Sequence, residues 1–316
     1  MKSKEFKTLD EQIELLKQKG LIFKNEEEAK NILARENYYF LTQEYEDVFM
    51  NLKASSKQNM KYASETYFEE LYAIYNLDRE LRNLIFDYIS LIETHLESYT
   101  SYVFAEKYGY KNYLKRENFI KGKQHDINIA NLFREIEQNK KRNFTDDTSD
   151  VKRYYMQNKF IPPWVIVKIF TFGTIANFYA LMKDEDKKVV AEYFGVNANN
   201  LNQYLKMLIV IRNICAHGDI LFNIRLRRKI NINDNKYHEA LKIQNSGNSY
   251  EYGANDLFAV MIILKNLLIP KDFKEMFIKI ENILSKVKNE LDSKSFNNLL
   301  EHMGFPKNYN ELDTIN

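Results

Sequence analysis

Residues 212–217, with the sequence RNICAH, contain the side chains of this chain best suited to chemistry. Arg212 offers a planar fork of hydrogen-bond donors that fits a phosphate. His217 can exchange protons near neutral pH, and Asn213 can orient either group through its amide. All three lie in an otherwise apolar stretch, where polar side chains require partners or a function.

These groups fit the cleavage of RNA, which carries its own nucleophile in the 2′-hydroxyl. Such a site needs only proton transfer and stabilisation of charge on the phosphate, without a metal ion, a cofactor or a covalent residue. Arg212 would stabilise the phosphate charge, His217 would act as general acid or base, and Asn213 would orient one of them. The spacing alone favours the alternative, a helix end in which Arg212 and His217 make only structural hydrogen bonds.

The element that positions these residues is a predicted helix over residues 201–217. At 3.6 residues per turn, Arg212 and His217 are separated by roughly 140° around the axis and do not share a face. Gly218 is predicted to end the helix, so that the long Arg212 side chain can reach around the terminus. A helix C-terminus also favours a protonated imidazole, which suits His217 as the acid.

The remaining pattern predicts an all-α protein. Nine Gly and four Pro are too few to punctuate a many-stranded β protein. Residues 66–108 lack both and have apolar side chains at helical spacing, which predicts one long helix or two in series. Further helices are expected over residues 8–19, from 26 towards 35, and over 163–182, 255–268, 272–288 and 295–302. Residues 139–150 are expected to form a polar loop, and residues 231–255 an exposed irregular excursion with a short hairpin.

The 46 basic and 44 acidic residues leave a net charge of +2, so any site for a polyanion must be a local patch. The single cysteine, Cys215, excludes internal disulfides and a Cys-based zinc cluster. No secretory signal is visible at the start. The apolar residues 164–182 approach membrane-spanning length, but Lys168 interrupts them, which favours a buried helix. We therefore expect a cytoplasmic protein that does not enter a membrane.

No break divides the chain into two folding units. We expect one domain, with an N-terminal helical extension over residues 1–60, a core over 61–230 that carries the RNICAH segment, and the polar excursion with C-terminal helices over 231–316.

Two basic clusters are candidates for binding an RNA backbone. The first lies just beyond the RNICAH segment and contains Arg225, Arg227, Arg228 and Lys229; the second contains Lys140, Lys141 and Arg142. Charge runs are most often simply solvated. We favour the first cluster because it follows His217 closely in the chain.

Beyond these patterns, the chain resembles the Abi-like family of abortive-infection proteins, the AbiD/AbiF type, whose core belongs to the HEPN superfamily. The matching segments are Asn37-Tyr38-Tyr39, Leu77-Asp78-Arg79-Glu80-Leu81-Arg82, Ile92-Glu93, Tyr108-Gly109, Pro163-Trp164-Val165, Phe172-Gly173-Thr174, Arg212-Asn213-Ile214-Cys215-Ala216-His217 and Met303-Gly304-Phe305-Pro306. Many members carry a second His directly after the first, where this chain has Gly218, as in the AbiF branch. Together these segments overturn the preference for a purely structural helix end.

The resemblance implies an all-α HEPN-like bundle and a role in phage defence or toxin–antitoxin-like growth control. It implies a metal-independent endoribonuclease, and, because HEPN ribonucleases often pair two such segments, a composite site formed with a second copy of the chain. It also implies a structured noncoding RNA as a partner, and Glu93 as the carboxylate beside Arg212, which a buried Arg requires. A surface ion pair of Glu93 with Arg82 is the alternative. Two other functions stay open: a non-catalytic RNA-binding protein, and a protein–protein interaction module in phage sensing.

Overall fold

The structure is a computed structural model that describes residues 6–315 except 44, 51–60, 112, 228–229, 233–234, 246 and 248–249. Within these residues the chain forms helices joined by turns, and its β pairing is limited to isolated bridges. The predicted all-α class is confirmed.

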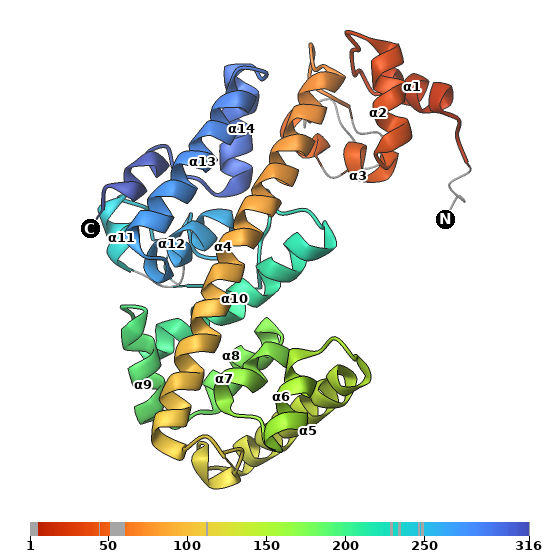
Figure 1. Cartoon of the computed structure of the whole chain (residues 1–316). Helices are drawn as coiled ribbons and strands as arrows, with labels where there is room; N and C mark the ends of the chain where they lie inside the picture. Colours follow the sequence, from red (N-terminus) through yellow and green to blue (C-terminus); the bar gives the residue numbers. More distant parts are fainter. Residues whose placement is uncertain are drawn as a thin grey trace.

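Helix α4 (Phe68–Tyr108) is the spine of the molecule and crosses nearly its whole height (Figure 1). Its 41 residues span about 60 Å. The Tyr67 N–H donates to the Glu70 carboxylate at 2.8 Å and fixes the start of the helix, and Gly109 ends it at a φ of +78°. The pattern over residues 66–108 therefore corresponds to one helix.

The N-terminal helices gather around the first turns of α4 (Figure 1). They are α1 (Leu9–Gln18), α2 (Glu26–Arg35), α3 (Tyr38–Gln43) and the 3₁₀ turn η1 (Glu46–Phe49). Thr8 and Glu11 form a capping box at the start of α1. Asn25 accepts the Glu28 N–H at 3.1 Å and caps α2.

The other end of α4 packs against a group of shorter helices (Figure 1). They are η2 (Arg116–Asn118), α5 (Lys123–Thr145), α6 (Asp150–Asn158), α7 (Pro163–Ile166), η3 (Val167–Ile169), α8 (Phe172–Leu181) and α9 (Asp184–Tyr193). The predicted loop over residues 139–150 is wrong in its first half, because α5 continues to Thr145. The Phe144 ring packs on Tyr155, with 5.2 Å between centroids, which stabilises this last helical turn.

The predicted single helix over residues 163–182 is also wrong. The chain turns after Ile169, and a new helix begins where the Thr171 hydroxyl accepts the Thr174 N–H at 3.1 Å. This capping arrangement separates α8 from α7 and η3. The separation lets the exposed Trp164 ring and the buried Phe172 ring belong to different helices.

The last part of the chain contains α10 (Ala198–His217), α11 (Asn235–Ala240), α12 (Leu257–Leu267), α13 (Pro270–Lys288), α14 (Ser293–Met303) and η5 (Tyr309–Asp313). In the described part of residues 231–255 there is one isolated antiparallel bridge, between Asn245 and Tyr250. Tyr237 and His238 are buried there, whereas Lys236, Glu239 and Lys242 are exposed, so the segment is only in part the exposed excursion that its composition indicates. The predicted C-terminal helices correspond to α12, α13 and α14.

One hydrophobic cluster extends from Ile13 in α1 to Leu312 in η5 and includes α4, α10 and α12. Residues 164–182 contribute to this cluster. Among the helices in the described residues, none is long and apolar enough to cross a membrane.

Candidate functional site

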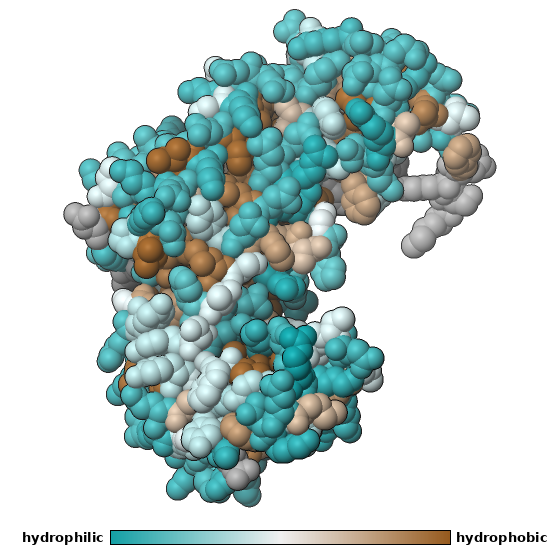
Figure 2. Space-filling model, in the orientation of Figure 1, coloured by the Kyte–Doolittle hydropathy of each residue, from teal (hydrophilic) through white to brown (hydrophobic). Residues whose placement is uncertain are grey.

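Helix α10 crosses α4, and its C-terminal end emerges on the concave side of the molecule (Figure 1). The outline of the surface is indented there, between α10 and the α5–α8 group (Figure 2). The RNICAH segment forms the last turn and a half of α10. Residues 212–217 therefore lead from the packed part of α10 to an exposed helix end.

Arg212 lies half-buried against α4. Its Nε is 4.0 Å from a carboxylate oxygen of Glu93, and its Cζ is 5.5 Å from the centroid of the Phe86 ring. The Nε is buried and has no hydrogen-bond partner among the described residues, while 34% of the side chain is exposed. The predicted pairing with Glu93 is present at the outer limit of an ion pair. The guanidinium retains donors that can bind an anion.

Two carboxyl groups on α4 shape the charge around Arg212. Burial raises the pKa of Glu93, and the positive charge of Arg212 opposes that rise. Burial, with a contribution from Glu93, raises the pKa of Glu97 to about 7. A large fraction of the Glu97 side chains is therefore neutral at neutral pH, which weakens the repulsion of an anion near Arg212.

The end of α10 is closed by a Schellman arrangement. Gly218 adopts a φ of +74°, its N–H donates to the Cys215 carbonyl at 3.4 Å, and the Asp219 N–H donates to the Ile214 carbonyl at 3.0 Å. The predicted stop after His217 is confirmed. Gly218 fits this left-handed position because it lacks a Cβ.

Asn213 and His217 are exposed, in contrast to Arg212. Within the described part of the chain, no side-chain hydrogen bond joins either of them to another residue. The helix continues through His217, so Arg212 and His217 lie roughly 140° apart around its axis. The structure brings Arg212 to Glu93 and leaves the His217 imidazole open to solvent.

The loop that follows the RNICAH segment is held by a buried network from α4. The Asp78 carboxylate accepts the Leu221 N–H at 3.2 Å, the Phe222 N–H at 2.7 Å and the Tyr45 hydroxyl at 2.8 Å. Arg82 pairs with Asp78 and donates to the Asp219 carbonyl at 3.3 Å. These contacts fix the direction in which the chain leaves α10.

Asp78 and Arg82 belong to a run of charges whose pattern is typical of a solvated helix face. Only part of the run is solvated: Arg79 and Glu80 are exposed, and they pair with Glu36 and Lys286. The i and i+4 spacing of Asp78 and Arg82 is compatible with a pair, but spacing does not reveal burial. Arg82 pairs with Asp78 rather than with Glu93.

Of the first basic cluster, Arg225 and Arg227 fall within the described residues and are exposed. The Arg225 guanidinium donates to the carbonyls of His302 and Glu301, at 3.1 and 3.2 Å, and so satisfies the end of α14. These bonds occupy donors that RNA phosphates would need. Arg228 and Lys229 lie outside the described residues.

The second basic cluster occupies the last turns of α5 instead of a loop. The Lys140 ammonium pairs with Glu137 at 3.0 Å, whereas Lys141 and Arg142 are exposed. Lys141 and Arg142 are therefore the members whose charges are accessible to a polyanion.

Cys215 lies between the two candidate catalytic residues in the chain. Burial raises the pKa of its thiol to about 12, and the nearby Asp78 carboxylate adds to the rise. The thiol stays protonated at neutral pH and is a poor nucleophile. This leaves Arg212, Asn213 and His217 as the groups of the segment that can take part in chemistry.

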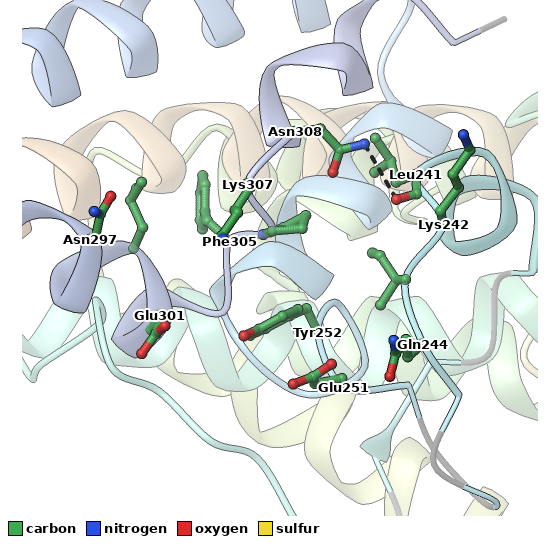
Figure 3. Close-up of a pocket in the computed structure, with 13 residues that line it drawn as sticks. Leu241, Lys242, Gln244, Glu251, Tyr252, Asn297, Glu301, Phe305, Lys307 and Asn308 are labelled. Carbon is green, nitrogen blue, oxygen red and sulfur yellow. Dashed lines mark hydrogen bonds between the residues drawn. The ribbon is translucent and has the colours of Figure 1, made fainter.

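A separate depression of about 690 Å³ lies between α14 and the segments around Leu241 and Phe305 (Figure 3). Asn308 donates to the Leu241 carbonyl across it at 3.3 Å. Side chains of both charge signs, including Lys307 and Glu301, line it. None of the residues predicted for catalysis or RNA binding contributes to its lining.

The fold and the site together define an all-α protein with a half-buried Arg and an exposed His at one helix end. Comparison with known families identifies the family of the chain. Residues 31–223, more than half of the chain, match the model of a family described as Abi-like protein. The chain belongs to the Abi-like family, and the family suggests a role in abortive-infection phage defence. No curated protein and no solved structure matches it.

The candidate site lies within the region that matches the family model. This region begins inside α2 and ends at Asn223, six residues after His217. It therefore includes the whole of α4 and α10, and it leaves α11 to α14 outside.

Proposed function

We propose that this Abi-like protein is a metal-independent endoribonuclease of the HEPN type that acts in phage defence or in toxin–antitoxin-like growth control. The observation that carries the proposal is the half-buried Arg212, whose guanidinium retains donors beside Glu93 while His217 stands exposed at the end of the same helix. A guanidinium that is held by a second carboxylate-bearing helix is oriented before a phosphate arrives.

The reaction needs two proton transfers and charge stabilisation. The 2′-hydroxyl loses its proton to a base, its oxygen attacks the adjacent phosphorus, and the bond from phosphorus to the 5′-oxygen breaks. That oxygen receives a proton, which His217 is placed to give as general acid. Arg212 stabilises the phosphate as negative charge develops on its oxygens. The products are a 2′,3′-cyclic phosphate and a 5′-hydroxyl.

The helix geometry favours a site made by two chains. Arg212 faces α4 and His217 points away from it by roughly 140°. An RNA phosphate can contact both groups of one chain only by bending around the end of α10. In a homodimer, Arg212 of one copy and His217 of the other can approach the same phosphate without that bend.

The test is incubation of purified protein with RNA in the presence of a chelator. We expect cleavage that leaves 2′,3′-cyclic phosphate ends and falls at least about 100-fold in Arg212→Ala and in His217→Ala. Arg134→Ala, which changes an exposed Arg on α5, and His95→Ala, on α4, are the matched controls. Cleavage that persists unchanged in both site variants would refute the proposal.

A second function is favoured by Gly218, which stands where many relatives have a second His. Gly218 adopts a left-handed conformation, which suits glycine. Because no second His stands there, the chain has one candidate proton carrier at this helix end instead of two. A non-catalytic protein that pairs with a structured noncoding RNA would keep Arg212 and the exposed helix end for binding. Tight RNA binding without cleavage in the same experiment identifies this function, and the absence of both favours a protein–protein interaction module in phage sensing.

A further inference from the structure

A groove of about 790 Å³ lies between α4 and the α7–η3 segment. Its walls carry three aromatic rings that are half exposed: Tyr102 at 57%, Tyr110 at 50% and Trp164 at 50%. The hydroxyls of Thr94, Ser98 and Ser101 belong to the same lining. Its volume falls within the range of about 300–1,000 Å³ that is typical of ligand pockets.

The groove continues the face of α4 that carries the contacts of Arg212. Phe86, Glu93, Glu97 and Ser101 follow one another at spacings of seven, four and four residues, which places them on one side of the helix. The first two contact Arg212, and the last two line the groove. At 1.5 Å per residue, Tyr102 lies about 14 Å along α4 from Glu93, so a chain of a few nucleotides can reach both.

We propose that this groove binds unpaired bases of single-stranded RNA, with the bases against Tyr102, Tyr110 and Trp164. Every base has a flat face that stacks on an aromatic ring, whereas bases within a duplex already stack on each other. The hydroxyls of Thr94 and Ser101 donate to the carbonyls of Ser90 and Ser98, at 3.0 and 2.8 Å. The exposed Ser98 hydroxyl is therefore the one that can donate to or accept from a base edge. Base binding is independent of the proposed function; only the role of the groove in holding a substrate for cleavage rests on it.

The charges around the groove suit a nucleic acid better than an apolar protein partner. Lys168 contributes an ammonium to the lining and is 61% exposed, and its ion pair with Asp150 is long, at 3.8 Å. Lys111 lies 5.4 Å above the Tyr110 ring and adds a second positive charge beside it. The aliphatic side chains of the lining are limited to Ala105 and Val167. The apolar surface of the groove is therefore mainly that of the three aromatic rings, which is the kind of surface on which bases stack.

The lining contains two acidic residues, and Glu97 is the one whose negative charge is reduced. The Glu106 carboxylate accepts a hydrogen bond from the Tyr102 hydroxyl at 3.0 Å. Burial raises the pKa of Glu97 to about 7, so this side chain is substantially neutral at neutral pH. A neutral carboxyl group can both donate and accept a hydrogen bond at a base edge.

Trp164 is the single tryptophan of the chain, so its fluorescence reports on the groove directly. The full chain is titrated with a single-stranded oligoribonucleotide of mixed sequence whose 2′-oxygens are methylated, because that modification blocks cleavage. We expect saturable quenching by the single strand and much weaker quenching by the same strand in a duplex. Tyr102→Ala should weaken binding about 5- to 150-fold, the usual effect of removing a stacking ring.

Lys168→Ala should weaken binding and reduce the slope of its salt dependence by about 0.7, the value for one phosphate contact on a single strand. Phe40→Ala, which removes an aromatic ring of similar exposure on α3, and Lys271→Ala, on α13, should leave quenching and salt slope unchanged. Absence of quenching, or quenching that Tyr102→Ala does not weaken, overturns the proposal and leaves another partner as the occupant of the groove.

The same oligonucleotide without methylation separates this proposal from the proposed function. Cleavage without quenching of Trp164 means that the protein is a ribonuclease that does not use the groove. Quenching without cleavage means that the groove binds RNA and that the catalytic proposal fails.

Discussion

Arg212 and His217 differ in how strongly the fold restrains them. Arg212 is held between Phe86 and Glu93, which limits the conformations of its long side chain. His217 is exposed and has no side-chain hydrogen bond within the described part of the chain. Under the proposed function, the restrained Arg212 would position the phosphate and the free His217 imidazole would deliver the proton.

The carboxyl group of Glu97 also affects the stability of the folded protein, and its effect depends on pH. Its pKa, raised to about 7 from 4.5, means that the folded protein favours the neutral carboxyl group. The stabilising contribution of that neutral form is complete below pH 4.5 and is lost as the pH rises through about 7. We expect Glu97→Gln to be about 1 kcal/mol more stable than the wild type at pH 8, after allowance for solvent screening, and no different at pH 4.5.

Urea unfolding at both pH values measures this difference, with Glu192→Gln on α9 as an exposed control that should behave as the wild type. A stability gain for Glu97→Gln that is equal at pH 4.5 and pH 8 would show that burial of the charge is not its cause.

At the scale of elements, two left-handed glycines end helices in the same way but in different surroundings. Gly218 and Gly304 both have a φ of +74°. A Cβ on Gly218 would meet nothing within 4 Å, whereas one on Gly304 would lie 2.3 Å from the Asp256 carboxylate. Gly218→Ala should therefore cost about 1–2 kcal/mol of backbone strain, and Gly304→Ala about 3 kcal/mol or more because a clash is added.

Chemical denaturation of the two variants compares the costs. Equal destabilisation would mean that Asp256 moves away freely, which its bonds to the Gly253 and Ala259 N–H groups oppose.

The Asp78–Arg82 pair joins α4 to the loop that follows α10. Removing Asp78 leaves Arg82 buried without its partner and frees the Leu221 and Phe222 N–H groups. We expect Asp78→Ala to lose about 3–5 kcal/mol of unfolding free energy. Glu80→Ala, in the same charge run but exposed, should change it by less than about 1 kcal/mol. A loss below about 1 kcal/mol in Asp78→Ala would contradict the structural role of the pair.

Local signals were sufficient to predict the helices that have clear ends. Thr8, Asn25 and Gly218 each satisfy backbone groups at a helix terminus, and their side-chain chemistry is legible without a fold. The break between η3 and α8 was not predictable in this way. The chain there is apolar on all sides, so its hydrophobic pattern continues through the turn, and the Thr171 cap is hidden among buried neighbours.

Predictions that rest on polar composition are wrong where the polar residues continue a helix or are packed in the fold. The last turns of α5 are basic and polar, yet good helix formers continue through Lys140, Lys141 and Arg142. His238 is completely buried and its Nε2 lies 2.9 Å from the Gly253 carbonyl oxygen, which is a tertiary contact that no local pattern contains. For the same reason the contact of Arg212 with Glu93 is predicted only from a family resemblance, and the anchoring of the following loop by Asp78 is visible only in the fold.

At the scale of the whole molecule, α4 connects every part of the proposed machinery. Its first half receives the N-terminal helices and, through Asp78, the Tyr45 hydroxyl. Its middle holds Arg212, and its last turns form a wall of the aromatic groove. The Asp78 carboxylate thus links the N-terminal helices, through Tyr45, to the loop after α10, through Phe222.

The two-chain site leads to a prediction for mixtures of inactive variants. In a symmetric dimer, each site would combine Arg212 of one copy with His217 of the other. Arg212→Ala and His217→Ala are each expected to be inactive alone. When the two are mixed and allowed to exchange subunits, half of the dimers contain both variants, and each of these has one intact site. We therefore expect about one quarter of the wild-type cleavage rate to return.

The measurement is the rate of RNA cleavage in the mixture, together with the molecular mass by sedimentation. Mixing Arg212→Ala with an Arg212→Ala/His217→Ala double variant is the control, because no pairing of those chains restores a complete site. A wild-type protein that cleaves RNA as a monomer, with no recovery in the mixture, requires the RNA to bend around the end of α10 within one chain. In that case Gly218, which leaves the helix end free of a side chain, is what makes room for the phosphate.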